Sequence, residues 1–62
     1  MNFRVQFLDA SAAVIAEWQA DANDAVAAIE LVHGLDWPAA AERIQILDDQ
    51  GRLVHWQSKN DR

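Results

Sequence analysis

Two histidines, His33 and His55, are the side chains of this sequence best suited to move protons near neutral pH. An imidazole can act as a general base or activate a nucleophile when a hydroxyl or thiol lies within hydrogen-bond reach. The chain has no cysteine, and its serines, Ser11 and Ser58, fall in a predicted loop and near the C-terminus. We therefore expect no Ser-His or Cys-His pair, and we predict that the protein is not an enzyme.

The adjacent acids Asp48 and Asp49 could form a metal site or a carboxylate dyad. Aspartate is also favoured in turns, where its side chain accepts hydrogen bonds from nearby backbone amides, and a calcium loop needs a longer series of oxygen ligands. Two histidines without thiolates make a poor zinc set. Two glycines 17 positions apart cannot form a phosphate-binding loop. We predict no metal, no cofactor and no small-molecule substrate.

Length and composition predict a single small domain over residues 1–62 with a thin core. The chain has 62 residues and is 52% apolar, but 12 of its apolar residues are alanine. So small a domain buries little surface, which favours stabilisation by a second subunit.

Charge and cysteine content narrow the partners and the compartment. A formal net charge of -5 removes the counterion release that drives nucleic-acid binding, and basic residues are not clustered as an anionic membrane would require. The longest apolar run, residues 10–16, is broken by Ser11 and is too short to span a bilayer. The absence of cysteine in so small a chain favours a reducing compartment. We expect a cytoplasmic protein that binds neither nucleic acid nor membrane.

Alternating apolar residues predict a first hairpin, with strands over residues 3–7 and 13–19 and a loop over residues 9–12. The register that keeps large apolar groups on one face sets Phe7 opposite Val14 and Phe3 opposite Trp18. The same register sets Arg4 opposite Glu17 on the other face.

A helix is predicted over residues 22–33, because Asp21 precedes an alanine-rich stretch that ends at Gly34. At 100° per residue, one face of about 120° would cover the sheet. The residues expected on that face are Ala22, Ala25, Val26, Ile29, Val32 and His33.

A second hairpin is predicted from strands over residues 43–47 and 53–57, with Gly51 in the left-handed conformation of its turn. Pairing Asp48 with Arg52 places Ile46 opposite Val54 and Ile44 opposite Trp56 on the core face. Leu47 then meets Leu53, and Gln45 meets His55, on the other face. A single helix over residues 37–48 is the alternative, since its apolar residues also have helical spacing.

These elements predict an α+β two-layer sandwich of ββαββ order, with one helix packed on one face of a four-stranded sheet. The simplest closure places the first and last strands side by side in parallel, a β-grasp-like arrangement. Residues 58–62 are polar and expected to fray.

Several large apolar side chains have no predicted place in the core and could contact a partner. Trp18 and Trp56 are expected in the core, whereas Trp37 either folds over the sheet edge or stands exposed. The candidate partner-contacting residues are Leu8, Ile15, Leu31, Trp37, Leu47, Leu53 and His55.

The segments over residues 3–9, the aspartate-initiated helix and residues 43–54 together resemble small uncharacterised alphaproteobacterial proteins of ββαββ pattern. This resemblance implies a bacterial source and no known activity. The first hairpin followed by residues 21–29 is also similar to the start of HicB-like antitoxins, which carry a third strand before the helix.

The amino-acid sequence is compatible with two functions. The first is a non-enzymatic protein-interaction module that forms a homodimer through the open sheet face or an edge strand. The second is an acidic, antitoxin-like or regulatory inhibitor that covers a basic protein partner.

Overall fold

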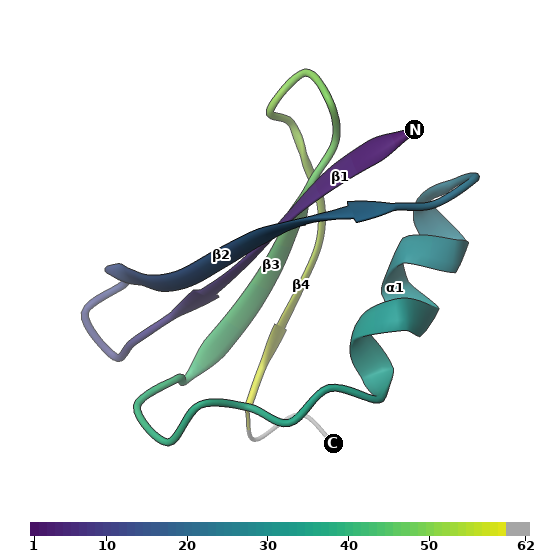
Figure 1. The fold of residues 1–62 in the computed structure, drawn as a ribbon. Helices are drawn as coiled ribbons and strands as arrows, with labels where there is room; N and C mark the ends of the chain where they lie inside the picture. Colours follow the sequence, from purple (N-terminus) through teal and green to yellow (C-terminus); the bar gives the residue numbers. More distant parts are fainter. Residues whose placement is uncertain (60–62) are drawn as a thin grey trace.

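The computed structural model describes residues 1–59 and shows one four-stranded sheet with one helix against a single face (Figure 1). This confirms the predicted α+β class and the ββαββ order. The elements are β1 (Asn2–Leu8), β2 (Val14–Asp21), α1 (Ala25–His33), β3 (Arg43–Leu47) and β4 (Leu53–Ser58).

The strand order is β2-β1-β3-β4, and each neighbouring pair is antiparallel. The first and last strands are therefore not neighbours, and the expected parallel pairing of a β-grasp is wrong. After α1 the chain crosses back and pairs β3 along the free side of β1, so β4 becomes an outer strand. The sheet has two edges, β2 and β4.

Beyond its bulge, the first hairpin keeps the predicted faces but has a register shifted by two residues. Before the bulge, Val14 lies opposite Leu8 instead of Phe7 and so leaves the core face. Val5 lies opposite Trp18, and Phe3 lies opposite Ala20 instead of Trp18. One residue of the shift comes from a wider loop, in which the Asp9 carboxylate accepts from the Ser11 and Ala13 amides at 2.9 and 3.0 Å. The other comes from a bulge between Ala16 and Val14. A shift of two preserves the alternation of faces.

The second hairpin follows the prediction only next to its turn. Leu47 lies opposite Leu53, and Gly51 has a φ of 81°, as expected. Val54 is then an extra residue in β4, because the register shifts between this pair and the next, Ile46 opposite His55. This β-bulge reverses the faces of the rest of β4.

The reversal corrects two predicted positions. Ile44 lies opposite Gln57 instead of Trp56, so Trp56 leaves the core face and is 52% exposed. His55 shares the side of the sheet on which Ile46 is buried, whereas it was expected on the open side.

The helix begins three residues later than predicted. Asp24 is its N-cap, and its Oδ1 accepts a hydrogen bond from the Ala27 amide at 2.9 Å. The buried helical residues are Ala28 and Val32, while Val26 is 65% exposed and His33 is exposed. The expected helical face was therefore rotated, because the small Ala28 side chain lies against the sheet in place of Val26.

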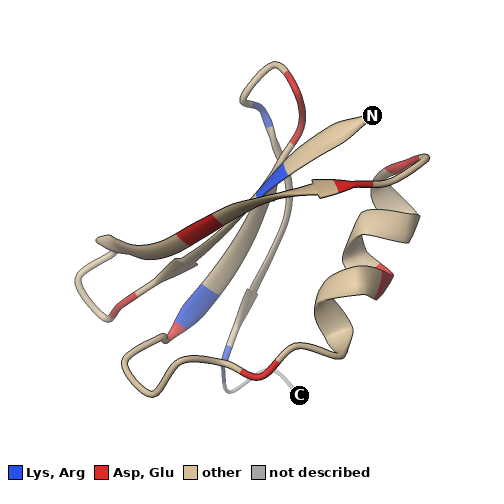
Figure 2. Cartoon of the chain, in the orientation of Figure 1, with Lys and Arg blue, Asp and Glu red and all other residues tan. Residues whose placement is uncertain are grey.

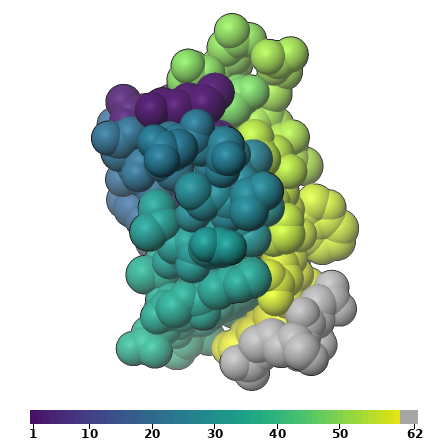
Figure 3. Space-filling view, turned by 90° about the vertical axis from the view of Figure 1, so that its right-hand side faces the viewer, coloured from purple at the N-terminus to yellow at the C-terminus, as the bar shows by residue number. Residues whose placement is uncertain are grey.

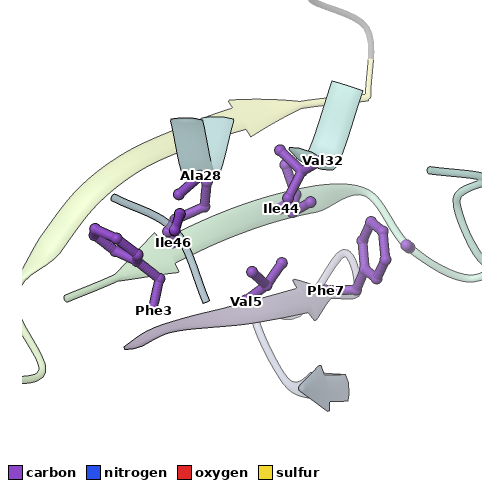
Figure 4. Packing of buried hydrophobic residues seen from close by; sticks show 9 residues of the cluster. Phe3, Val5, Phe7, Ala28, Val32, Ile44 and Ile46 are labelled. Atoms are coloured by element: carbon purple, nitrogen blue, oxygen red, sulfur yellow. The ribbon is translucent and has the colours of Figure 1, made fainter. Parts of the chain in front are cut away.

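The core lies between the helix and the two central strands (Figure 4). Trp18 and Trp37 extend it, with ring centroids 5.5 and 5.3 Å from that of Phe7. Trp37 thus folds back over the core, and the alternative helix over residues 37–48 is wrong because β3 occupies residues 43–47. The main buried apolar side chains are Phe3, Val5, Phe7, Ala28, Val32, Ala41, Ile44 and Ile46.

The last strand reaches one residue beyond its predicted end. Ser58 belongs to β4, and the Lys59 amide donates to the Glu42 carbonyl at 2.8 Å. The expectation that residues 58–62 fray stays a prediction, and residues 60–62 lie outside the described residues.

Ala12 has a φ of 67°, a left-handed conformation that costs a residue with a Cβ about 1 to 2 kcal/mol. We expect Ala12→Gly to raise the free energy of unfolding by about 0.5 to 1 kcal/mol after the greater backbone entropy of glycine is deducted. Urea denaturation at fixed protein concentration measures this change. Ala10→Gly, in the same loop without positive φ, should be neutral or destabilising, and equal effects of the two substitutions would contradict the assignment.

Candidate interaction surface

The sheet has two unlike faces. The inner face carries Phe3, Val5 and Phe7 against the helix, whereas no other described element covers the outer face (Figure 1). Because directly paired residues point to the same side, the strand register places Gln6, Glu17 and Gln45 together on the outer face.

These three residues form a polar ladder across the middle of the outer face. The Gln6 amide donates to Glu17 Oε2 at 2.5 Å, and the Gln45 amide donates to Gln6 Oε1 at 2.6 Å. Gln6 is only 8% exposed, so both partners satisfy polar groups that have little contact with water. The middle of this face is hydrogen-bonded and polar, unlike an apolar docking surface.

Two arginines flank the ladder. Arg4 Nε lies 4.0 Å from Glu17 Oε1, so the predicted pair shares a face and meets diagonally, since Arg4 is directly opposite Gln19. The Arg43 guanidinium lies 5.4 Å from the centroid of the Trp56 ring, within the range of a cation–π contact. Trp56 therefore has an aliphatic and cationic neighbour on one side and solvent on the other.

The candidate contact residues are distributed over several parts of the molecule. Leu8 is buried at 6% exposure and Leu47 is partly buried, so neither is the open leucine that was expected. Ile15, at the start of β2, is exposed, and Leu31 is exposed on the helix. Trp37 packs on Phe7. Only Leu53 combines exposure, at 54%, with a position on β4.

Several exposed apolar residues were not among the candidates, and two of them, Val14 and Trp56, lie on the edge strands. Trp56 was assigned to the core, and Val14 was paired inside the first hairpin, but both are about half exposed. Both errors have a local cause, because each residue lies within two positions of the extra residue of a bulge. No residue pattern in this sequence marks the position of either bulge.

The free edge of β4 is neutral and partly apolar. We call residues Leu53–Ser58 the β4 edge; the segment LVHWQS holds no Lys, Arg, Asp, Glu or Pro. The side chains of Leu53 and Trp56 lie on the outer face of the sheet, and about half of the surface of each is exposed. In the view onto the helix side, the yellow atoms of β4 form one lateral margin of the molecule (Figure 3). Proteins usually protect such an edge with charges or proline.

The opposite edge, β2, has that protection. Glu17 and Asp21 lie on it, and the N-terminal ammonium group is 3.2 Å from Asp21 Oδ1. A bulge also interrupts β2 near its start. Each edge strand thus has one bulge near its start, and the two edges differ in charge, since β4 carries no charged residue.

His55 lies on the inner side of β4 and is half-buried. Its Nε2 atom is buried and has no hydrogen-bond partner among the described residues. His33 is exposed at the end of α1, on a different element. The described residues contain no group of three or more His, Cys, Asp or Glu side chains arranged to hold a metal ion.

Acidic residues lie on the helix, on β2 and in both hairpin loops, whereas Arg4 and Arg43 lie on the central strands (Figure 2). A few of the acidic residues border the helix side. A hollow of about 440 Å³ lies there, between the end of β2 and the helix. It is lined by Asp21, Ala22, Asn23, Ala27, Glu30 and Leu31.

The Asp48 carboxylate is used within its turn. It accepts from the Gln50 and Arg52 amides at 2.9 and 2.8 Å, and the Arg52 guanidinium lies 3.4 Å away. The amide of Arg52 is the main cause that lowers the pKa of Asp48 below its ordinary value of 3.8. The Ser11 hydroxyl acts in the same way on the pKa of Asp9. Asp48 therefore stabilises its turn, and Asp49 is an exposed residue of the same turn.

Comparison with known proteins gives no further guide. No protein-family model, no curated protein and no solved structure matches this chain. Within the described residues, no helix is long and apolar enough to cross a membrane. The function must be inferred from the surfaces themselves.

A carboxyl group whose pKa is lower in the folded state stabilises the fold above its unfolded pKa, and this contribution is lost as pH falls. For Asp48 the loss should occur as pH falls through 3.8 and below. We expect Asp48→Asn to be less stable than wild type at pH 6 and to lose less stability on acidification, as measured by urea denaturation from pH 6 to pH 2.

Asp49→Asn is the matched control, because the Asp49 side chain makes no hydrogen bond or ion pair with the described residues. It should retain the wild-type pH dependence. Identical pH profiles for Asp48→Asn and wild type would show that the turn does not depend on the Asp48 charge.

Proposed function

We propose that this protein is a non-enzymatic protein-interaction module that forms a homodimer through the β4 edge. The observation that carries the proposal is the composition of that edge: Leu53 and Trp56 stand exposed on an outer strand that has no charged or proline residue. An unprotected edge offers backbone amides and carbonyls to another strand, and exposed apolar side chains add contact area.

A second copy of this chain fits the edge for reasons of charge. Each copy carries a net charge of -5, so two copies repel each other over most approaches. The β4 edge is neutral, and the basic Lys59 follows it directly. Contact through β2 would instead bring Glu17 and Asp21 of both copies together.

The outer face as a whole is a weaker interface than the edge. Its middle is occupied by Gln6 and Gln45, whose hydrogen bonds are already made within the chain. Burying this ladder under a second sheet would remove Arg4 and Glu17 from water with little apolar area in return. The edge version requires no such desolvation.

The double substitution Leu53→Lys with Trp56→Lys tests the proposed interface. We expect wild type to sediment as a dimer and the variant as a monomer at the same concentration, because charges on an edge strand oppose strand pairing. Analytical ultracentrifugation over a hundredfold concentration range measures the mass, and circular dichroism checks that the variant is folded.

The matched control is Val14→Lys with Ile15→Lys, which places the same charges at exposed apolar positions on the other edge strand. This variant should remain a dimer. A monomeric wild type, or a dimer that is broken by the β2 substitutions and not by those in β4, would contradict the proposal.

A second candidate function is binding of a basic protein by the helix side, in the manner of an acidic inhibitor. It is favoured by the position of Asp21 and Glu30 on one hollow beside the helix. The expected behaviour is retention on an immobilised lysine-rich peptide that falls as salt rises and is weakened by Glu30→Gln. Retention equal in low and high salt would count against this candidate, as would an unchanged Glu30→Gln variant.

A further inference from the structure

The hydrogen-bonding pattern of β4 identifies which of its backbone groups point to the free edge. The Lys59 amide donates to the Glu42 carbonyl. The next pair along the ladder, Arg43 opposite Ser58, is therefore a non-hydrogen-bonded pair. Hydrogen-bonded and non-hydrogen-bonded pairs alternate along an antiparallel ladder. Gln57 and His55 therefore bond to β3, while the amides and carbonyls of Trp56 and Ser58 point away from it.

The bulge limits how much of the edge is regular. Val54 is the extra residue, and its side chain packs against the core on the inner side of the sheet. His55 also lies on the inner side, so two consecutive residues share one side and the alternation is broken there. From His55 to Ser58 the alternation is regular, with Trp56 and Ser58 on the outer side and His55 and Gln57 on the inner side. Lys59 follows the strand, and its amide still donates to the Glu42 carbonyl. Among the described residues, a partner strand can pair in regular register only along residues 55–58 and the adjoining Lys59.

We propose that two copies join β4 to β4 antiparallel about a two-fold axis that passes beside Gln57 and perpendicular to the sheet. This inference rests on the proposed function, and it adds which residues of the two β4 strands pair with each other. Trp56 then lies opposite Ser58 of the second copy. Gln57 lies opposite Gln57 of the second copy, and His55 lies opposite its Lys59. Every one of these pairs joins residues from the same side of the sheet.

Symmetry and the bulge argue against registers centred on His55 or on Trp56. A two-fold axis perpendicular to the sheet keeps both inner faces on one side, so the axis must pass beside a residue and not between two residues. An axis at His55 would set the inner Val54 opposite the outer Trp56. An axis at Trp56 gives matched pairs only from 55 to 57 and sets Val54 opposite Ser58.

The register at Gln57 also uses the free backbone groups best. Trp56 and Ser58 of opposite copies form hydrogen-bonded pairs on both sides of the axis, and each such pair exchanges two hydrogen bonds. The two Trp56 rings become diagonal neighbours on the outer side, within reach of each other. The two four-stranded sheets then form one continuous sheet with both helices on the same face.

Single cysteine variants test the register, because the chain has no cysteine of its own. A residue on the axis faces its own copy with Cα atoms about 4.5 to 5.5 Å apart, which a disulfide can span. We expect Gln57→Cys to convert most of the chain to a disulfide-linked dimer under mild oxidation, while His55→Cys and Trp56→Cys stay largely unlinked. Non-reducing denaturing electrophoresis measures the linked fraction.

A mixture of Trp56→Cys and Ser58→Cys variants provides a test that leaves Gln57 intact. Mass spectrometry should find the mixed disulfide in excess over either symmetric one. Strong linkage of Trp56→Cys or His55→Cys alone would overturn the register and leave the β4 edge as the interface. A wild-type dimer in which none of these variants links would overturn pairing at β4, and a monomeric wild type would overturn the proposed function itself.

Discussion

The extra residue Val54 is the constraint on which the character of the free edge depends. Without a bulge at this position, Trp56 would face the helix and His55 would face solvent, because a shift of one residue exchanges the two sides of a strand. With it, Val54 still packs against the core, but Trp56 stands on the outer side beside Arg43. The bulge also interrupts pairing at the start of β4, so only its second half presents a regular edge. The exposed tryptophan and the limit on register therefore share one cause.

A single short helix sets the second constraint, since it can cover only one face of the sheet. The other face carries the polar ladder of Gln6, Glu17 and Gln45. These side chains hydrogen-bond to one another, so their polar groups are satisfied without a covering helix. On the helix side, Glu30 and Asp21 border one hollow. The molecule thus presents a hollow with two acidic residues, a polar face and a neutral edge. Of these, the edge offers both apolar side chains and backbone groups directed outward.

The sequence predicted the elements well because each has a strong periodic signal. The alternation in β1 and the buried positions Ile44 and Ile46 identify strands whatever their partners are. The cap of α1 was harder to place, because Asp21 and Asp24 both precede alanines. Asp21 ends β2, and it is the Asp24 side chain that accepts a hydrogen bond from the Ala27 amide. The strand order depends on how the chain crosses the sheet after α1, which no local pattern records.

The candidate surface could be predicted only in part, and the bulges explain why. Leu53 lies before the bulge of β4, and its exposure followed from the turn register. Trp56 lies after it, and the register that best matched charge and hydrophobicity placed it in the core. Leu8 was assigned to the open side by alternation alone, but neighbouring side chains on that side leave it only 6% exposed. Alternation predicts the side of a sheet and does not predict what covers it.

The most direct test of pairing at β4 is amide hydrogen exchange of Trp56 and Ser58, followed by NMR at a low and at a hundredfold higher protein concentration. In a lone chain these amides point away from β3 and should exchange quickly, whereas those of His55 and Gln57 are held by the ladder. Pairing of two copies predicts that exchange at Trp56 and Ser58 slows as concentration rises, while the amides of β2 keep their rates. Fast exchange at Trp56 and Ser58 at both concentrations would contradict it.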